Sequence, residues 1–398
     1  MAVAGSVEER HGIILAKNEL AKKYGIVTAE TVASARRKCP SLVLCPPHYD
    51  EYVRYSRAAG RIYAFYTDLV EPFGIDESWL DVTASRKLFG GGETIAQEIR
   101  QRMKTELGIT VSVGVSFNKV FAKLGSDYKK PDAVTVISRD NFRQIVYPLP
   151  VSALLFVGRH TEETLRRMGV YTIGDLAETE ADALYLRLGK PGEALGAYAR
   201  GEDDSPVSPI REAAKSISNG FTFPRDLTGR AECRLGIAYL TEEIGTKLRA
   251  GHMKCTTVTL KIKDSFLRTV QKQKKISPPT DITREIVSVA ENLLSDMWKS
   301  DAPVRMITVG VSDLVGADSG EQMTLFDDMS DVQNRGKIRK RDEAVDGIRQ
   351  KFGAAAIMTA SFMGNDSGLL FAKSEKNEKD QKKSVKTVRL FSHSFSVL

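Results

Sequence analysis

Two neighbouring carboxylates, Asp76 and Glu77, are the side chains of this sequence whose types and spacing most clearly indicate chemistry. They lie between residues 70–75 and 78–83, which both have the composition of short β-strands. Neighbouring side chains within one strand point to opposite faces, but at the tight turn of a hairpin they can converge. Convergent carboxylates suit Mg²⁺, a hard cation that prefers oxygen ligands and leaves positions open for substrate phosphates. Taken alone, such a pair is more often an ordinary polar turn. Other segments of the chain must therefore show whether it is a turn or a metal site.

The segments that must position this hairpin predict an α+β layer. They are a helix over 49–67, a helix over 93–107, a strand over 109–115, a helix over 118–128 and a strand over 133–137. In the second helix, Ile95, Ile99 and Met103 recur at fourfold spacing, which indicates one apolar face. This order of elements predicts an antiparallel sheet with helices on one face.

The segments upstream of these elements predict a small subdomain. Its expected elements are strands over 1–5 and 13–16 and helices over 18–24 and 29–38. Thr28 is the expected N-cap of the last helix, and Pro40 the residue that stops it.

Downstream, Pro148 and Pro150 mark a boundary. Beyond it we expect a helical region over 151–201, a linker over 202–209, a strand-and-helix domain over 211–314 and a tail over 315–398. Within the tail, the lysine- and glutamate-rich residues 373–387 are expected to be disordered. A chain of 398 residues is too long for one hydrophobic core, so roughly two to four domains agree with this division.

Composition excludes several classes of protein. Hydrophobic content of 42% and charged content of 27% are those of a soluble globular chain, and no apolar run approaches the roughly 20 residues of a membrane span. The first residues lack the pattern of a secretory signal. The cysteines and histidines show no metal-binding or disulfide spacing, so we expect a reducing cytoplasm. The net charge of +7 favours an anionic partner.

Residues 157–169 and 172–176 look like a helix-hairpin-helix. In that motif a glycine-rich turn at a helix N-terminus offers backbone N–H groups to a DNA phosphate. Gly158 is the candidate for this contact, and His160 stands where the usual turn has its second glycine. An ordinary helical packing unit is an equal alternative.

A basic strand is predicted over 254–263. Its apolar residues alternate with Thr257, Thr259, Lys261 and Lys263, and Arg268 follows in the next turn. A threonine and lysine face suits a sheet laid along a phosphate backbone. Without further context, a solvated strand face is the somewhat better interpretation.

A short apolar segment interrupts the acidic part of the tail. In Gln322-Met-Thr-Leu-Phe326, the residues Gln322, Leu325 and Phe326 could anchor in an apolar pocket of a partner protein. A single pentapeptide of this kind is weak evidence.

Taken in order, these segments resemble the Y-family (lesion-bypass) DNA polymerases, closest to the bacterial polymerase IV branch. The resemblance runs from about Ala2 to Phe326 and is carried by three motifs, at residues 15–25, 74–81 and 114–123. It implies an α+β, multidomain right-hand polymerase with a ferredoxin-like palm. The implied domains are fingers over 1–55, palm over 56–150, helical thumb over 151–201, α/β little finger over 211–314 and a tail over 315–398 with a clamp-binding-like motif at 322–326.

The resemblance also implies roles for single residues. Asp76 and Glu77 would be the catalytic carboxylates and the ligands of Mg²⁺, with two ions roughly 3.5–4 Å apart in a complete site. Lys123 matches the triphosphate-binding lysine of the family. Lys22 stands where the family often has an arginine for the same purpose, and Lys119 is a weaker candidate. The implied partners are primer-template DNA including damaged DNA, deoxynucleoside triphosphates and, through the tail, a sliding clamp; no membrane is implied.

The sequence departs from the family pattern at its N-terminus. Family members begin with a strand of hydrophobic-Asp-x-Asp pattern, followed by an aromatic residue that excludes ribonucleotides, and nothing before Ala2 supplies either. An aspartate of that strand would be the third carboxylate of the metal site, so we expect its absence to lower the reaction rate by at least a thousandfold. We also expect unpaired backbone groups on the neighbours of the missing strand. A start codon assigned too late, a shortened chain and a decayed gene are the explanations left open.

The predicted function is template-directed DNA synthesis of low fidelity, in translesion synthesis and DNA repair, by a monomer in the bacterial cytoplasm associated with the nucleoid. The alternative is a non-catalytic module that binds DNA and the sliding clamp. A nucleotide cyclase-like palm is a third interpretation, which the thumb-like segment and the basic strand disfavour.

Overall fold

The carboxylate hairpin forms where the sequence predicts it, in a computed structural model of the protein. Strand β4 (Val70–Pro72) pairs antiparallel with β5 (Glu77–Leu80). The N–H of Phe73 donates to the carbonyl oxygen of Glu77 at 2.8 Å and closes the turn. Gly74 has a φ of +90°, a conformation that side-chain-bearing residues rarely adopt, so the turn depends on this glycine.

The structure describes residues 1–7, 10, 12–210, 213–298, 302–318, 329–353, 356–362 and 392–397. It divides into two compact units. The first consists of Met1–Pro46 with Ala213–Lys386, and the second of Pro47–Glu212 with Thr387–Leu398. None of the described helices is long and apolar enough to cross a membrane.

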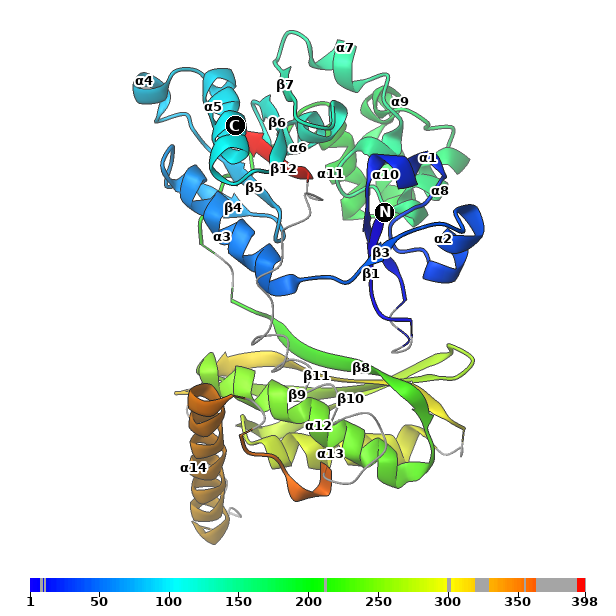
Figure 1. The fold of residues 1–398 in the computed structure, drawn as a ribbon, viewed down its shortest axis with the longest axis vertical. Helices are drawn as coiled ribbons and strands as arrows, with labels where there is room; N and C mark the ends of the chain where they lie inside the picture. Colours follow the sequence, from blue (N-terminus) through cyan, green and yellow to red (C-terminus); the bar gives the residue numbers. More distant parts are fainter. Residues whose placement is uncertain are drawn as a thin grey trace. The chain divides into compact units, whose positions relative to one another are not determined.

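The predicted palm contains a five-stranded sheet of order β4-β5-β12-β6-β7 (Figure 1). Its further strands are β6 (Thr110–Ser116), β7 (Val134–Ile137) and β12 (Ser392–Val397). Only β4 and β5 pair antiparallel; the other three pairs are parallel. The prediction of an antiparallel sheet was therefore wrong, because the helix between β6 and β7 returns the chain to the same end of the sheet.

Strand β12 also overturns the expectation of unpaired backbone inside this sheet. It comes from the C-terminus of the chain and pairs with Glu77–Leu80 on one side and with Thr110–Val115 on the other. The position beside the carboxylate hairpin is thus filled, by a segment in which the sequence predicted no element.

Helices cover both faces of this sheet, not one as predicted. Helices α3 (Tyr49–Ala64) and α5 (Gly92–Glu106) share a core with Leu80, Val111 and Val113. Helix α6 (Lys119–Tyr128) lies on the opposite face, where its Ala122 packs against Trp79 of β5. The α6-facing residues of β6 are small and partly polar, Ser112 and Gly114, so in the sequence they resemble a solvent-facing side. Short helices α4 (Arg86–Phe89) and α7 (Phe142–Val146) complete the region.

The backbone of α6 approaches that of β6 at Gly114. A Cβ atom on Gly114 would lie 1.9 Å from the carbonyl oxygen of Ala122 and 2.5 Å from the nitrogen of Ser126. Gly125 makes the matching surface of the helix, because its own Cβ would lie 3.1 Å from the Cα of Gly114. Glycine at position 114 is therefore required for α6 to lie this close to the sheet.

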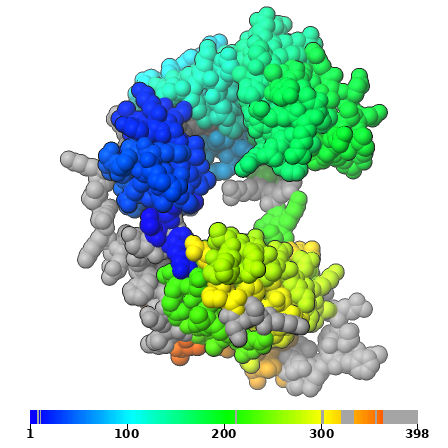
Figure 2. All heavy atoms as spheres, turned by 90° about the vertical axis from the view of Figure 1, so that its right-hand side faces the viewer, coloured from blue at the N-terminus to red at the C-terminus, as the bar shows by residue number. Residues whose placement is uncertain are grey.

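The predicted thumb is helical, as the sequence indicated. Its elements are η1 (Val151–Ala153), α8 (Arg159–Arg167), α9 (Ile173–Glu178), α10 (Ala181–Leu188) and α11 (Lys190–Ala199). Their apolar residues form one core with Val120, Phe121 and Ile137 of the palm. Figure 2 accordingly shows the cyan, teal and green residues of this region as one continuous mass.

The N-terminal segment forms a three-stranded sheet of order β2-β1-β3. Its elements are β1 (Ala2–Ala4), β2 (Ile14–Lys17), β3 (Leu44–Cys45), α1 (Glu19–Lys23) and α2 (Val32–Lys38). The prediction of Thr28 as N-cap was wrong: Thr31 caps α2, its hydroxyl accepting from the N–H of Ser34 at 3.1 Å. Both threonines satisfy the cap preference, and only the fold selects between them.

The predicted little finger is a four-stranded antiparallel sheet of order β10-β9-β11-β8. Its elements are β8 (Ser216–Leu227), α12 (Gly229–Ala250), β9 (Met253–Asp264), β10 (Thr269–Thr280), α13 (Thr283–Met297) and β11 (Val304–Gly316). Both helices pack on one face, around Val258, Leu260 and Ile262 of β9. The opposite face therefore carries the alternate residues of each strand.

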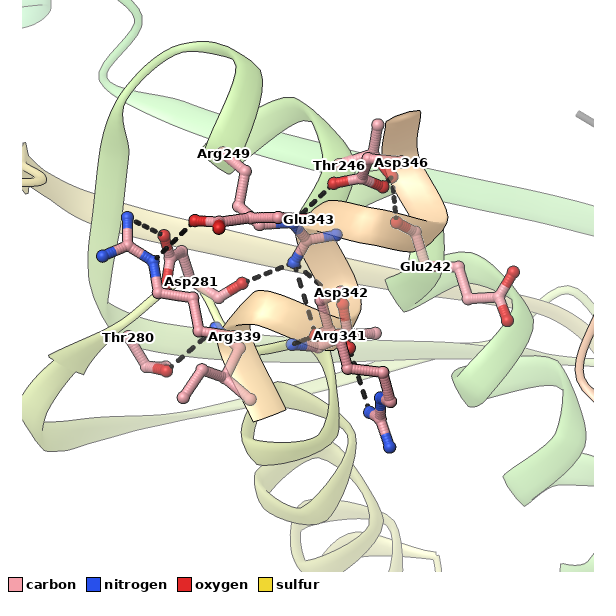
Figure 3. Close-up of polar contacts among 12 residues, drawn as sticks. Glu242, Thr246, Arg249, Thr280, Asp281, Arg339, Arg341, Asp342, Glu343 and Asp346 are labelled. Atoms are coloured by element: carbon pink, nitrogen blue, oxygen red, sulfur yellow. Dashed lines mark hydrogen bonds and ion pairs between the residues drawn. The ribbon is translucent and has the colours of Figure 1, made fainter. Parts of the chain in front are cut away.

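A further helix, α14 (Met329–Phe352), lies within residues 315–398, where the sequence analysis expected only a tail. It lies against α12 of the little finger (Figure 3), and η2 (Ala360–Phe362) follows it and also contacts α12. Residues 373–387 lie outside the described part of the chain, so their expected disorder stays a prediction.

Ion pairs dock α14 on the little-finger residues. Arg249 of α12 donates to Asp346 at 2.6 Å and lies 3.5 Å from Asp342, and its side chain is only 7% exposed (Figure 3). Nearer the start of the helix, Arg339 pairs with the buried Asp281 at 2.9 Å. The docking residues of α14 recur every three or four positions and so lie on one face of the helix. Because they are charged, the same pattern in the sequence is typical of a helix face exposed to solvent.

We expect Gly114→Ala to destabilise the palm by about 1–3 kcal/mol or more, because the added methyl group must force α6 off the sheet. Gly60→Ala is the matched control, since a Cβ on Gly60 in α3 meets nothing within 4 Å. The control should leave stability unchanged or raise it by up to about 1 kcal/mol. Urea unfolding of the two variants compares these effects, and equal stabilities would contradict the contact.

Arg249→Ala should release α14, because Asp346 would lose its cation and the buried Asp342 would keep only the exposed Arg341. Breaking such a largely buried ion pair costs up to about 3–5 kcal/mol. Hydrogen exchange across 333–352 should accelerate strongly in this variant. Lys337→Ala, an exposed residue of the same helix, serves as control and should leave exchange unchanged. Undisturbed protection of α14 in the Arg249 variant would refute docking by ion pairs.

Candidate polymerase site and nucleic-acid surface

The candidate site lies at the start of β5, where Glu77 meets α6. The Nζ atom of Lys123 donates to Glu77 Oε1 at 3.1 Å and to Asp127 Oδ2 at 2.7 Å. The side chains of Glu77 and Lys123 are 22% and 13% exposed, so this contact is partly shielded from water. The structure thus brings together two of the residues that the sequence analysis singled out for the site.

Local hydrogen bonds hold α6 in place to make this contact. Asn118 caps the helix, with its Oδ1 accepting from the N–H of Phe121 at 2.8 Å and its Nδ2 donating to the Gly201 carbonyl at 2.9 Å. The indole N–H of Trp79 donates to the carbonyl oxygen of Lys119 at 3.0 Å. These bonds join the start of α6 both to Gly201, at the end of the predicted thumb, and to strand β5.

Burial and charge act against each other at Glu77. Burial raises the pKa of Glu77 above its ordinary value, the ammonium of Lys123 opposes this, and the negative charge of Asp76 adds to the rise. Burial also acts on Lys123, but hydrogen bonds to Asp127 and Glu77 outweigh it and raise the pKa of the lysine. Lys123 therefore stays protonated and supplies a fixed positive charge beside Glu77.

Asp76 lies in the turn, outside β5, and is exposed. Its charge is felt by Glu77 and also by the buried Tyr63 of α3, whose pKa burial raises well above its usual value. Two carboxylates with hard oxygen donors, one exposed and one half-buried, are a suitable ligand set for a Mg²⁺ ion that shares its coordination with substrate phosphates. Among the residues whose placement is described, no group of three or more potential metal ligands gathers.

A second ion pair near the hairpin was missed by sequence reasoning. Lys119 binds both carboxylate oxygens of Glu71 at 2.7 Å and lies 4.5 Å from the centre of the Trp79 ring. Glu71 also accepts from the backbone N–H of Ser208, in the predicted linker, at 2.7 Å. Lys119 is thus engaged in fastening the linker to the hairpin. No sequence signal points to this contact, because Glu71 and Ser208 are 137 residues apart.

Lys22, the other predicted nucleotide-binding residue, belongs to the other unit. It lies in α1 with its side chain 67% exposed and 3.8 Å from Glu19. Its role toward a triphosphate stays a prediction.

The outer face of the little-finger sheet forms a polar surface with aligned rows of side chains. Lys261 pairs in register with Gln271 of β10 and Thr308 of β11, and Thr308 in turn with Gly220 of β8. The next row on the same face is Gln273, Thr259, Gly310 and Ser218. Lys261 is exposed and Lys263 half-buried, whereas the intervening Ile262 is buried. Small residues on β8 and β11, beside the lysines of β9, leave this face accessible to an extended anionic ligand.

The remaining predicted DNA-binding residues lie at element ends. Arg268, in the β9–β10 turn, is 74% exposed, with its Nε donating to the buried Asp264 at 2.8 Å. Gly158 is the N-cap of α8, without a side-chain cap, and a Cβ there would meet nothing within 4 Å. Gln322, Leu325 and Phe326 lie outside the described residues.

Comparisons with known proteins agree with this geometry. The impB/mucB/samB family matches residues 1–127, and its C-terminal domain matches residues 214–325. A DNA polymerase IV of Acetivibrio thermocellus is 47% identical over 93% of this chain and 92% of its own length. The DNA polymerase IV of Clostridium acetobutylicum is 34% identical, over 89% of this chain and 88% of its own.

The fold comparison points the same way. A solved Y-family DNA polymerase chimera superposes with a TM-score of 0.69, covering 79% of this chain and 92% of its own, at 22% sequence identity. The hairpin, α6 and the little-finger sheet thus belong to a chain that is similar in sequence to these polymerases over almost its whole length. This chain belongs to the impB/mucB/samB family, the Y-family DNA polymerases.

Proposed function

We propose that this chain carries out template-directed DNA synthesis in translesion synthesis and DNA repair, with Asp76 and Glu77 as its catalytic carboxylates. Family membership makes it a DNA-directed DNA polymerase, and the observation that carries the residue assignment is the hairpin braced by α6. The alternative of a non-catalytic DNA- and clamp-binding module is not favoured, because the DNA polymerase IV relatives match over most of their length.

The chain's own residues would act by holding charge in fixed positions. Y-family polymerases generally depend on divalent metal ions, and Asp76 and Glu77 would hold Mg²⁺, which supplies charge stabilisation for phosphoryl transfer. Lys123 would move from Glu77 to the triphosphate of an incoming nucleotide, since it holds a positive charge directly beside this proposed metal ligand. Lys22 would contact the same triphosphate from the fingers.

The proposed DNA contacts need no sequence readout. The outer face of the little-finger sheet, with Lys261 and Lys263, would follow one phosphate backbone, with Arg268 at the end of the hairpin. The uncapped N-terminus of α8 at Gly158 would offer backbone N–H groups to another phosphate.

The domain roles and partners complete the proposal. Residues 1–55 would be fingers, 56–150 palm, 151–201 thumb and 211–314 little finger, although the boundary at 55 falls inside the continuous helix α3. Gln322, Leu325 and Phe326 would contact a sliding clamp. The polymerase would act as a monomer in the bacterial cytoplasm, associated with the nucleoid.

Asp76→Asn should reduce Mg²⁺-dependent primer extension by about 10²–10³-fold, because it removes a principal source of fixed negative charge from the site. Asp68→Asn, an exposed aspartate before the other strand of the hairpin, is the matched control and should extend primers at the unchanged rate. Single-turnover extension with saturating nucleotide measures both. An unimpaired Asp76 variant would contradict the assignment.

The double variant Lys261→Ala/Lys263→Ala should bind primer-template more weakly and with a salt dependence reduced by about two units of log–log slope, one for each lost phosphate contact. Lys272→Ala is the control, because Lys272 pairs with Asp296 of α13 on the helix side of the sheet. Fluorescence anisotropy over a range of NaCl concentrations gives the slopes. Equal slopes in all three proteins would exclude the sheet face as the DNA surface.

A further inference from the structure

The strand position between β5 and β6 lies in the interior of the palm sheet. β5 and β6 are not neighbours; β12 lies between them and is parallel to both (Figure 1). Leu80 of β5 and Ser112 and Val113 of β6 are buried. Helix α6 lies across β12 as well as across β6. Buried backbone N–H and C=O groups must be paired, so this sheet requires a strand in this position.

Without β12, the sheet would divide into the β4–β5 hairpin and the β6–β7 pair. Two-stranded pieces are marginally stable by themselves. The hairpin carries Asp76 and Glu77, whereas α6 with Lys123 is fixed to β6 through Gly114. The backbone hydrogen bonds of β12 therefore join the two halves of the candidate site.

The register places the occupant directly beside the site. Ser394 pairs with Glu77 on one side and with Ser112 on the other. Pairing of this kind depends on the backbone and tolerates many sequences, as in strand addition to an exposed sheet edge. The segment Ser392–Val397 contains no aspartate or glutamate, so β12 adds no carboxylate to the two of the hairpin.

We propose that the space between β5 and β6 is a strand-acceptor site, and that the chain's own C-terminal strand β12 is its exchangeable occupant. While β12 is bound, the Asp76–Glu77 hairpin is held in the sheet; when β12 leaves, the hairpin loses its backbone connection to β6. The C-terminus of the chain thus controls the order of the candidate site. This inference stands apart from the proposed polymerase activity and makes no use of it.

A disulfide tests the occupancy and the register in the full chain. Residues paired across adjacent strands share a face and have Cα atoms about 4.8 Å apart, within the range that a disulfide spans. Ser394→Cys/Ser112→Cys should therefore form an intramolecular disulfide under mild oxidation, located by peptide mapping. Ser394→Cys/Val113→Cys is the control: Val113 is shifted by one residue and faces the other way. The four native cysteines are the same in both proteins.

A crosslink in the paired variant alone supports the proposal. Equal crosslinking in both variants, or none in either, overturns it. A disulfide between two chains would also overturn it, because the occupant would then be a second copy.

A backbone substitution tests exchangeability. Ser394→Pro removes an N–H from the middle of β12 and should reduce hydrogen-exchange protection of β5 and β6 by at least tenfold, whereas Ser394→Ala keeps the N–H and should not. A synthetic peptide of residues 387–398, added to the proline variant, should restore protection, and the same peptide with proline at 394 should not. Unchanged protection in the proline variant, or no rescue by the native peptide, would overturn the proposal. Neither readout depends on DNA synthesis, so the failure of one proposal is distinguishable from that of the other.

Discussion

The close approach of α6 to β6 at Gly114 is the constraint on which the candidate site depends. Only a residue without Cβ allows the carbonyl of Ala122 to lie against the strand. From that position the first two turns of α6 extend Lys119 and Lys123 over the β4–β5 hairpin, where each finds a carboxylate. A more distant helix would leave Glu77 half-buried without a nearby cation, a state that partial desolvation disfavours.

The predicted palm depends on segments from distant parts of the chain. The predicted thumb shares its core with α6, the backbone N–H of Ser208 donates to Glu71, and β12 supplies an interior strand of the sheet. Each of these contacts converges on the hairpin or on the helix facing it. The positions of Asp76 and Glu77 therefore depend on all of these segments together. This explains why the C-terminal strand can influence them.

Charge is used in two ways in the first unit. On the outer face of the little-finger sheet, the exposed Lys261 and the half-buried Lys263 lie beside small residues, as suits a phosphate backbone. On the helix side, arginines and carboxylates pair with one another to dock α14. The net charge of +7 is the small difference between 58 basic and 51 acidic residues, so it indicates an anionic partner without locating its surface.

The sequence by itself determined the family and most elements upstream of residue 315, because helix periodicity, strand alternation and turn glycines act over a few residues. The hairpin at Asp76 and Glu77, the helix α5 and the alternation in β9 follow from such local signals. The tertiary structure decided which faces are covered. Ser112 and Gly114 look solvent-facing in the sequence yet lie beneath α6, and the charged face of α14 looks solvated yet is docked. Pairing across hundreds of residues, as for β12 beside β5, depends on what remains unpaired after the local elements have formed, and no local pattern carries that information.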